Sequence, residues 1–305
     1  IMFGLGYVLL FQIESAWELY LYYGLLVGTG VAAHDVGTLS TIARWFVRRR
    51  GLMTGFVKAG AGFGQVIAPI AAAALIAGPG WRFTCLIIGL SAIPILIAAA
   101  QILRRNPASL GLKPDGETPD ASTSRLHQED GATFKEACRS RTLWILCIAK
   151  FCDLFCLFTV IVHIVPFGVD HGIEPTVAAG VLSTIGAMSI FGRIVLGGTF
   201  DRFGARWSLL TCFAVLAASL GLLQFAESAW SLFLFALIYG PAHGGFWTIT
   251  SPSVAEYFGT RAHGTLFGLV VCCGTFGATL GPVVAGSLFD RGGELQLCLR
   301  ATTGL

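Results

Sequence analysis

Long apolar runs constrain this chain more than any other feature of its sequence. They recur about every 25–30 residues, and each is long enough to cross the roughly 30 Å hydrocarbon core of a bilayer as a helix. Charged residues make up 12% of the 305 residues, against about 25% in a soluble domain. These features argue against a soluble globular domain and predict an all-α polytopic membrane protein.

The apolar runs and the polar turns between them predict nine membrane spans. Their approximate bounds are 1–13, 19–43, 52–77, 83–103, 142–168, 176–200, 207–226, 231–255 and 264–289. A polar linker with three prolines covers 104–140, and its last stretch, 133–140, is a candidate surface helix. We therefore expect an N-terminal helix bundle over 1–103, a linker over 104–140, and a C-terminal bundle with a polar tail over 141–305.

Lysine and arginine gather in every second loop. The basic loops are 44–50, 104–141, 201–206 and 257–263. The opposite loops are mainly acidic, and the net charge of the whole chain is only +3. Because basic loops stay on the cytoplasmic side, we predict that these four loops face the cytoplasm. The membrane itself is predicted to be the cell membrane, either an inner or a plasma membrane.

Two stretches of the chain repeat each other. Arg44–Pro69 opens with a run of arginines and continues as a glycine-rich apolar segment, and Tyr257–Pro282 has the same order. The matched residues are Phe46 with Phe258, Gly51 with Gly264, Gly55 with Gly268, Gly64 with Gly277 and Pro69 with Pro282. Such a repeat is typical of a transporter built from two related halves. With six helices in each half, the nine spans would be helices 3–11 of twelve. We then expect helices 1, 2 and 12 to be missing and the chain alone not to transport.

The loop G-G-T-F-D-R-F-G-A-R resembles the cytoplasmic loop between helices 8 and 9 of the major facilitator superfamily. The residues that it keeps are Gly197, Asp201, Arg202, Gly204 and Arg206. The resemblance implies two pseudo-symmetric six-helix bundles and a gating role for these residues. Asp201 can cap a helix N-terminus and pair with a base, and Gly204 permits a tight turn. The alternative is a solvated turn anchored by its arginines.

Within that superfamily the chain is similar to the monocarboxylate and oxalate:formate porter group. R-W-F-V-R-R-R-G-L-M-T-G resembles the entry to helix 5 of that group, and G-W-R resembles the start of its helix 6. Y-F-G-T-R-A-H-G and L-G-P-V-V-A-G-S-L-F-D resemble its helix 10–11 region. The resemblance covers nearly all of the chain except its last dozen residues.

Ionisable side chains inside the predicted spans are candidates for function, because a charge within a bilayer is costly. The resemblance implies that Arg193 binds substrate, since porters of this group carry an arginine at the matching place. A guanidinium can hold a carboxylate through two hydrogen bonds. In porters of this group an acidic residue lies four positions before that arginine, whereas this sequence has Ser189 at that position. The alternative for Arg193 is snorkelling to the inner interface.

The other candidates divide into two sets. Further substrate contacts are Lys58, Lys150 and His243, and proton-coupling candidates are His34, Asp35 and Asp153. Lys150 and Asp153 are three residues apart and share one face of a helix, so they form either a structural pair or a switchable one. The alternatives are snorkelling for Lys58, an interhelical ion pair for Asp35, and a packing role for His243.

These features predict a secondary active transporter of a small organic anion, either a monocarboxylate or a dicarboxylate. The mechanism would be proton symport or anion exchange by alternating access. Efflux of a drug or amphipathic molecule by the same fold is one alternative, and a transporter-like membrane sensor is another. We expect no enzymatic activity, cofactor, metal or nucleic acid partner, and we expect a monomer. Most of the nine cysteines lie in apolar spans and are interpreted as small buried hydrophobic residues.

Overall fold

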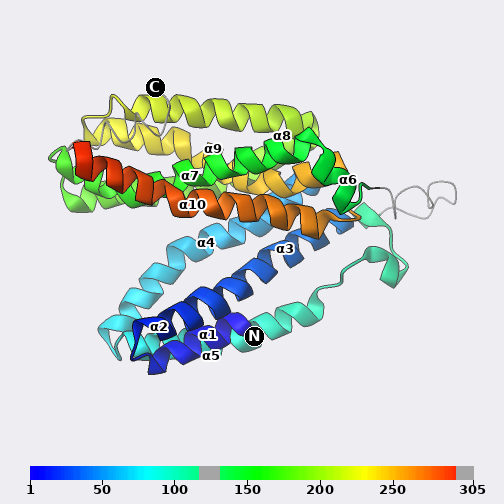
Figure 1. Cartoon of the computed structure of the whole chain (residues 1–305), viewed down its shortest axis with the longest axis horizontal. Helices are drawn as coiled ribbons and strands as arrows, with labels where there is room; N and C mark the ends of the chain where they lie inside the picture. Colours follow the sequence, from blue (N-terminus) through cyan, green and yellow to red (C-terminus); the bar gives the residue numbers. More distant parts are fainter. Residues whose placement is uncertain (117–130, 293–305) are drawn as a thin grey trace. The chain divides into compact units, whose positions relative to one another are not determined.

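The computed structural model describes residues 1–116 and 131–292, most of which are helical (Figure 1). Within this part, six helices are long and apolar enough to cross a membrane. They are α4 (Arg50–Ala77), α5 (Trp81–Ile102), α7 (Arg141–Asp170), α8 (Pro175–Leu223), α9 (Ala229–Phe258) and α10 (His263–Gly292). The fold is therefore the all-α polytopic membrane fold that the sequence predicts.

The first two predicted spans are helical but built from several segments. These are α1 (Met2–Leu9), η1 (Leu10–Gln12), α2 (Ala16–Leu19), η2 (Tyr20–Val27) and α3 (Gly28–Trp45). The second span begins at a capping box, in which the Ser15 hydroxyl accepts from the Glu18 N–H and the Glu18 carboxylate accepts from the Ser15 N–H. The segment η2 is a π-helix. The apolar pattern does not predict it, because π-helical geometry is rare and buries the same residue types as an α-helix.

The predicted sixth and seventh spans are two arms of α8. Gly204 is the residue of α8 that leaves helical geometry, with φ 75° and ψ 179°. The predicted loop 201–206 is therefore much shorter in the structure, where the helix continues through Asp201 and Arg202. Glycine has no Cβ and adopts this positive φ without steric strain. With α8 counted as two arms, seven of the predicted spans lie in helices long and apolar enough to cross a membrane, and the first two predicted spans are helical over 2–12 and 16–45.

The described part of the linker contains short helices. They are η3 (Pro107–Leu110), η4 (Pro114–Gly116) and α6 (Phe134–Arg139). The Thr133 N–H donates to the Glu136 carboxylate at 2.7 Å, and this hydrogen bond holds the pKa of that carboxyl below its usual value. The rest of the predicted linker, 117–130, and the predicted tail, 293–305, lie outside the described residues.

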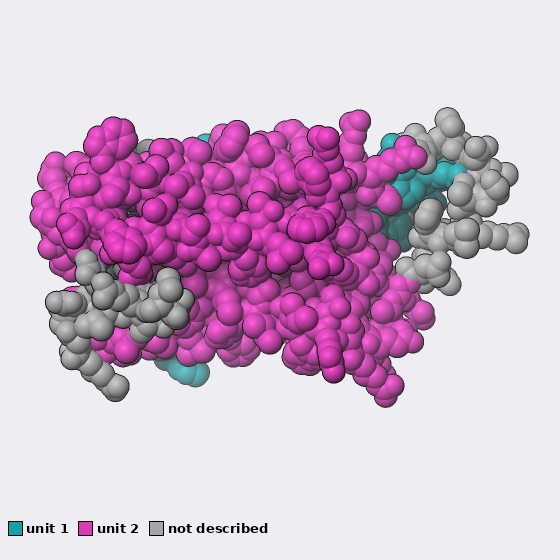
Figure 2. Space-filling view, turned by 90° about the horizontal axis from the view of Figure 1, so that it is seen from above, with its two compact units in different colours: residues 1–45, 64–119 teal, residues 46–63, 120–305 magenta. Residues whose placement is uncertain are grey.

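The chain divides into two compact units. Unit 1 comprises Ile1–Trp45 and Gly64–Pro119, and unit 2 comprises Phe46–Phe63 and Asp120–Leu305 (Figure 2). Helix α4 therefore contributes to both units. Within unit 1, α1 packs on α5. The backbones meet at Gly4 and Gly89, since a Cβ on Gly89 would lie 2.6 Å from the Gly4 carbonyl oxygen.

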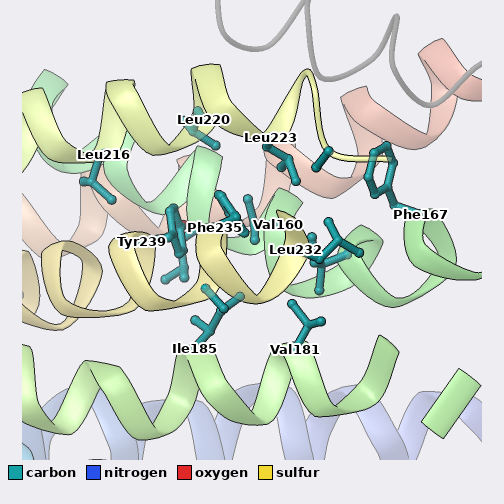
Figure 3. Packing of buried hydrophobic residues seen from close by; sticks show 14 of the residues in the cluster. Val160, Phe167, Val181, Ile185, Leu216, Leu220, Leu223, Leu232, Phe235 and Tyr239 are labelled. Atoms are coloured by element: carbon teal, nitrogen blue, oxygen red, sulfur yellow. The ribbon is translucent and has the colours of Figure 1, made fainter. Parts of the chain in front are cut away.

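The core of unit 2 lies between α7, α8 and α9, while α10 packs along α7. Its largest members include Phe167 of α7, Ile185 of α8, and Phe235 and Tyr239 of α9 (Figure 3). Val181 in the first arm of α8 and Leu216, Leu220 and Leu223 in the second arm belong to the same cluster. The two arms of α8, which meet at the break at Gly204, therefore contribute to one core, with Phe235 and Tyr239 of α9 between them (Figure 3).

Candidate functional site

Arg193 lies in the first arm of α8, where glycines of α4 allow close approach. A Cβ on Gly55 would meet the carbonyl oxygen of Arg193, and one on Gly62 would lie 3.1 Å from its Nη1. The Arg193 side chain is 3% exposed, and its Nη1 donates to the carbonyl oxygen of Lys58 at 2.6 Å. Arg193 and Lys58, predicted as substrate contacts from distant parts of the sequence, are thus neighbours within unit 2.

Trp247 of α9 connects two predicted substrate residues. The Lys58 Nζ lies 5.1 Å from the centroid of the Trp247 ring, and the Lys150 Nζ lies 4.4 Å from it. Lys150 also lies over the ring of Phe246, at 4.9 Å. The negative face of an aromatic ring attracts a cation, most strongly where the cation is removed from water. Both lysines are buried, so these aromatic faces replace part of their lost hydration.

Lys150 and Asp153 form the ion pair that their spacing on α7 predicts. The Lys150 Nζ donates to the Asp153 Oδ2 at 2.9 Å, and both side chains are almost completely buried. Gly274 of α10 makes room for the pair, because a Cβ there would lie 2.8 Å from the Lys150 Cγ. Among the acidic residues whose burial the structure describes, Asp153 is the one that is buried.

His243 of α9 is buried and stacks on Tyr239, one turn earlier, with ring centroids 6.0 Å apart. Among the described residues, its Nδ1 has no hydrogen-bond partner. The next residue, Gly244, contacts the backbone of Ser189 on α8. The Ser189 hydroxyl, which replaces the acid of the porter pattern, donates to the Gly186 carbonyl at 2.7 Å. Ser189 therefore serves helix packing, and His243 carries the unsatisfied polar atom.

The predicted proton-coupling residues His34 and Asp35 lie on α3. His34 is exposed, and Asp35 is half-buried. Both belong to unit 1, whereas the buried cations of the site belong to unit 2. Of the three predicted proton carriers, the structure brings Asp153 next to predicted substrate residues.

The predicted gating residues surround the break in α8. The Asp201 carboxylate accepts from the backbone N–H groups of Gly51, at 2.6 Å, and Leu52, at 2.9 Å. These groups open α4, so Asp201 caps a helix N-terminus, where a negative charge is favourable. Gly197 allows this approach, because a Cβ on it would lie 2.5 Å from the Gly51 carbonyl oxygen. Arg202 and Arg206 lie over the adjacent rings of Phe203 and Trp207.

A model of the Major Facilitator Superfamily matches residues 1–202 and again residues 189–302. The chain belongs to the major facilitator superfamily. As a member it is a multi-pass integral membrane protein, in agreement with its apolar helices.

The relatives of this chain include one protein named for efflux and one named for monocarboxylate transport. The agnestins efflux protein AgnL12 of Paecilomyces divaricatus is 25% identical over 284 residues, which cover 93% of this chain and 62% of that protein. Monocarboxylate transporter 12 of Homo sapiens is 24% identical over 316 residues, which cover 95% of this chain and 60% of that protein. The chain thus spans about three fifths of the length of these relatives.

The solved structures that resemble this superfamily chain support the same fold. The crystal structure of the major facilitator transporter FucP in the outward conformation superposes with a TM-score of 0.74 at 14% sequence identity. The match covers 99% of this chain and 77% of FucP. The identity is low, so this likeness concerns the fold alone.

Two residues of the site were not among the sequence candidates. Glu256, at the end of α9, accepts from the Ala205 N–H at 3.0 and 3.2 Å and so caps the second arm of α8. Trp247 joins the two lysines. The position of Glu256 directly before a basic loop could have indicated its capping role. Trp247 has no such signal, because it is one aromatic residue among many in apolar helices.

Within the described ranges, no group of three or more His, Cys, Asp or Glu side chains could hold a metal ion.

Proposed function

We propose that this chain forms most of the helical core of a secondary active transporter for a small organic anion with a carboxylate group. Transport proceeds by alternating access, coupled to proton symport or to anion exchange. The proposal includes two bundles, 1–103 and 141–305, joined by a linker at 104–140 on the cytoplasmic side. The cell membrane is the proposed location.

The observation that carries this proposal is the grouping of three buried cations, in which Trp247 lies between Lys58 and Lys150 and Arg193 contacts Lys58. Lys58 and Lys150 both lie over the Trp247 ring, and Arg193 donates to the backbone of Lys58. Burying cations is costly, and membrane proteins retain such charges mainly where function needs them. A carboxylate is the ligand that a guanidinium and ammonium groups bind best.

Proton coupling is assigned to Asp153, with Asp35 and His34 as further carriers. Asp153 is paired with Lys150, so protonation of Asp153 would release the ammonium group to meet the substrate anion. The Asp153–Lys150 pair thus links proton occupancy to substrate affinity in the proposed cycle. His243, with its unsatisfied Nδ1, is a polar contact for the substrate in the same scheme.

The test is uptake of labelled lactate, formate and oxalate by the full-length protein in proteoliposomes, with and without a pH gradient. We expect uptake of at least one of these anions, and we expect Arg193→Lys to reduce it by about tenfold, because an ammonium group cannot reproduce the paired hydrogen bonds of a guanidinium. Arg139→Lys is the matched control, since Arg139 lies exposed on α6. Undiminished uptake by Arg193→Lys removes Arg193 from the site.

Efflux of an amphipathic molecule is the second candidate, because a relative that matches 93% of the chain is named as an efflux protein. The sequence Ala68-Pro69 argues against it, since many drug-efflux members have a Gly-Pro pair in this helix. Efflux of a lipophilic dye, without uptake or exchange of any carboxylate, would reverse the order of the two candidates.

A further inference from the structure

Aromatic and imidazole rings recur at a spacing of four residues along α9. The residues are Phe235, Tyr239, His243 and Trp247. Residues four apart lie on one face of a helix. The rings of Phe235 and Tyr239 stack with centroids 5.0 Å apart, and those of Tyr239 and His243 stack with centroids 6.0 Å apart. Trp247 continues the spacing of this ring column by one further turn.

The ring column is buried except at Trp247. Phe235 and Tyr239 lie in the core of unit 2 (Figure 3), and His243 is 6% exposed. The structure describes every residue from 242 to 255, and Trp247 is the one among them that is not buried. A small molecule that reaches this part of α9 therefore contacts the indole ring of Trp247 before any other side chain of the helix.

Two cations lie next to this accessible indole. The Lys58 Nζ is 5.1 Å from the centroid of the Trp247 ring, and the Lys150 Nζ is 4.4 Å from it. Both lysines are buried, and charges attract each other more strongly away from water. A ligand at the indole thus has an apolar, planar surface on one side and ammonium groups within reach. These surroundings favour an anion that carries a planar apolar group.

We propose that Trp247 stacks on an aromatic ring of the substrate, so that the substrate is an aryl carboxylate. Paired aromatic rings have centroids about 4.5–7 Å apart, which is close to the distances of the two ammonium groups from the indole. The ring of the substrate can therefore contact Trp247 while its carboxylate binds the cations. The inference rests on the proposed function, because it adds the second half of the molecule whose carboxylate that function assigns.

The test compares two acids of similar size and equal charge. Benzoate has a planar aromatic ring, whereas cyclohexanecarboxylate has a puckered saturated one. Equilibrium binding of both acids and of lactate, each radiolabelled, is measured at neutral pH on the full-length protein in lipid nanodiscs, with empty nanodiscs as the correction for partition into lipid. We expect benzoate to bind about three- to tenfold more tightly than cyclohexanecarboxylate, the range that a pair of aromatic rings adds beyond its buried area.

Substitutions of Trp247 separate ring stacking from carboxylate binding. Trp247→Leu should remove the preference for benzoate, whereas Trp247→Phe keeps an aromatic ring and should retain most of it. Trp230→Leu is the matched control and should leave the preference unchanged. Trp230 lies exposed at the start of the same helix, about 25 Å along the axis from Trp247. Thermal unfolding in nanodiscs shows whether each variant is folded.

The outcomes distinguish this inference from the proposed function. Equal affinity of the unsubstituted protein for the two ring acids, or a preference for benzoate that survives Trp247→Leu, would overturn the stacking role. Loss of the preference in Trp230→Leu would also contradict it. In each of these cases, binding of lactate would still support the carboxylate site. If none of the three acids binds, the proposed function itself fails, and this inference fails with it.

Discussion

At the residue scale, the buried cations of unit 2 are stabilised in different ways. Lys150 has an ion pair with Asp153 and lies over the rings of Phe246 and Trp247, whereas Lys58 lies over the ring of Trp247. Arg193 donates to a backbone carbonyl. A buried ion pair is seldom more stable than an apolar pair of similar volume, so folding stability alone does not account for these charges, in line with the proposed role in substrate binding.

The Lys150–Asp153 pair gives the first prediction. Asp153→Asn should destabilise the protein by about 3–5 kcal/mol, because it leaves the ammonium group of Lys150 buried without its counter-charge. The double variant Lys150→Met/Asp153→Leu should recover most of this loss, since it removes both charges together. Thermal unfolding in nanodiscs measures both effects. Asp170→Asn, at the exposed end of the same helix, is the matched control, and an equal loss of stability there would contradict the prediction.

The sequence predicts this site unevenly. Lys150 and Asp153 are three residues apart, and helical geometry alone places them together. The contact between Arg193 and Lys58, and the position of Trp247 between two lysines, depend on how α4, α7, α8 and α9 pack. No local pattern contains that information. The family resemblance points to Arg193. No sequence feature distinguishes Trp247 from the other aromatic residues in the apolar helices.

At the element scale, glycines set the distance between helices. Gly55 and Gly62 of α4 face Arg193, and Gly244 of α9 faces Ser189. Without side chains, backbones can approach closely, which is the main way in which membrane helices gain packing contacts. The repeat in the sequence identifies Gly55 among these residues, but it gives no partner for it. The π-helical segment and the exact break at Gly204 likewise follow from local geometry that hydropathy does not encode.

Gly55→Ala should move α4 away from α8 and displace Arg193. We expect a loss of about 1–3 kcal/mol in stability, as for other overpacked positions, together with weaker carboxylate uptake. Gly60→Ala is the matched control on the same helix, because a Cβ there meets no atom within 4 Å. That variant should be neutral or more stable by about 0.5–1 kcal/mol, since alanine favours a helix over glycine. Equal effects of the two substitutions on unfolding and uptake would refute the role of Gly55.

The caps around the break in α8 can be tested separately. Asp201→Ala removes the acceptor for Gly51 and Leu52 and should cost about 0.5–2 kcal/mol, whereas Glu256→Ala removes the acceptor for Ala205. Amide hydrogen exchange should therefore rise at Gly51 and Leu52 in the first variant and at Ala205 in the second. Each variant serves as the control for the other, and uniform changes in both would indicate general loosening instead of the loss of individual caps.

At the scale of the whole molecule, the basic loops of unit 2 gather at one end of its helices. Asp201 contacts the start of α4, and Glu256 contacts Ala205. Gly131 at the end of the linker pairs with Gly259 in the turn between α9 and α10. The turns after α7 and after α8, which contain Glu174 and Glu227 and no lysine or arginine, lie at the opposite helix ends. The alternation of charge along the sequence thus corresponds to two ends of one helical unit, as expected for a membrane protein with a fixed orientation.

The last prediction is the direction in which these ends face. In a variant with all native cysteines replaced by alanine, a new cysteine at Thr260 should react with a membrane-impermeant maleimide only after the cytoplasmic side is opened. A cysteine at Gly172, in the turn between α7 and α8, should react from outside in intact cells. The physical reason is that arginine-rich loops remain on the cytoplasmic side during insertion, and Arg261 lies beside Thr260, whereas the neighbours of Gly172 include Asp170 and Glu174. Labelling of the Thr260 position from outside would show that the topology is the reverse of the predicted one. The Asp201 cap would then lie on the opposite side of the membrane.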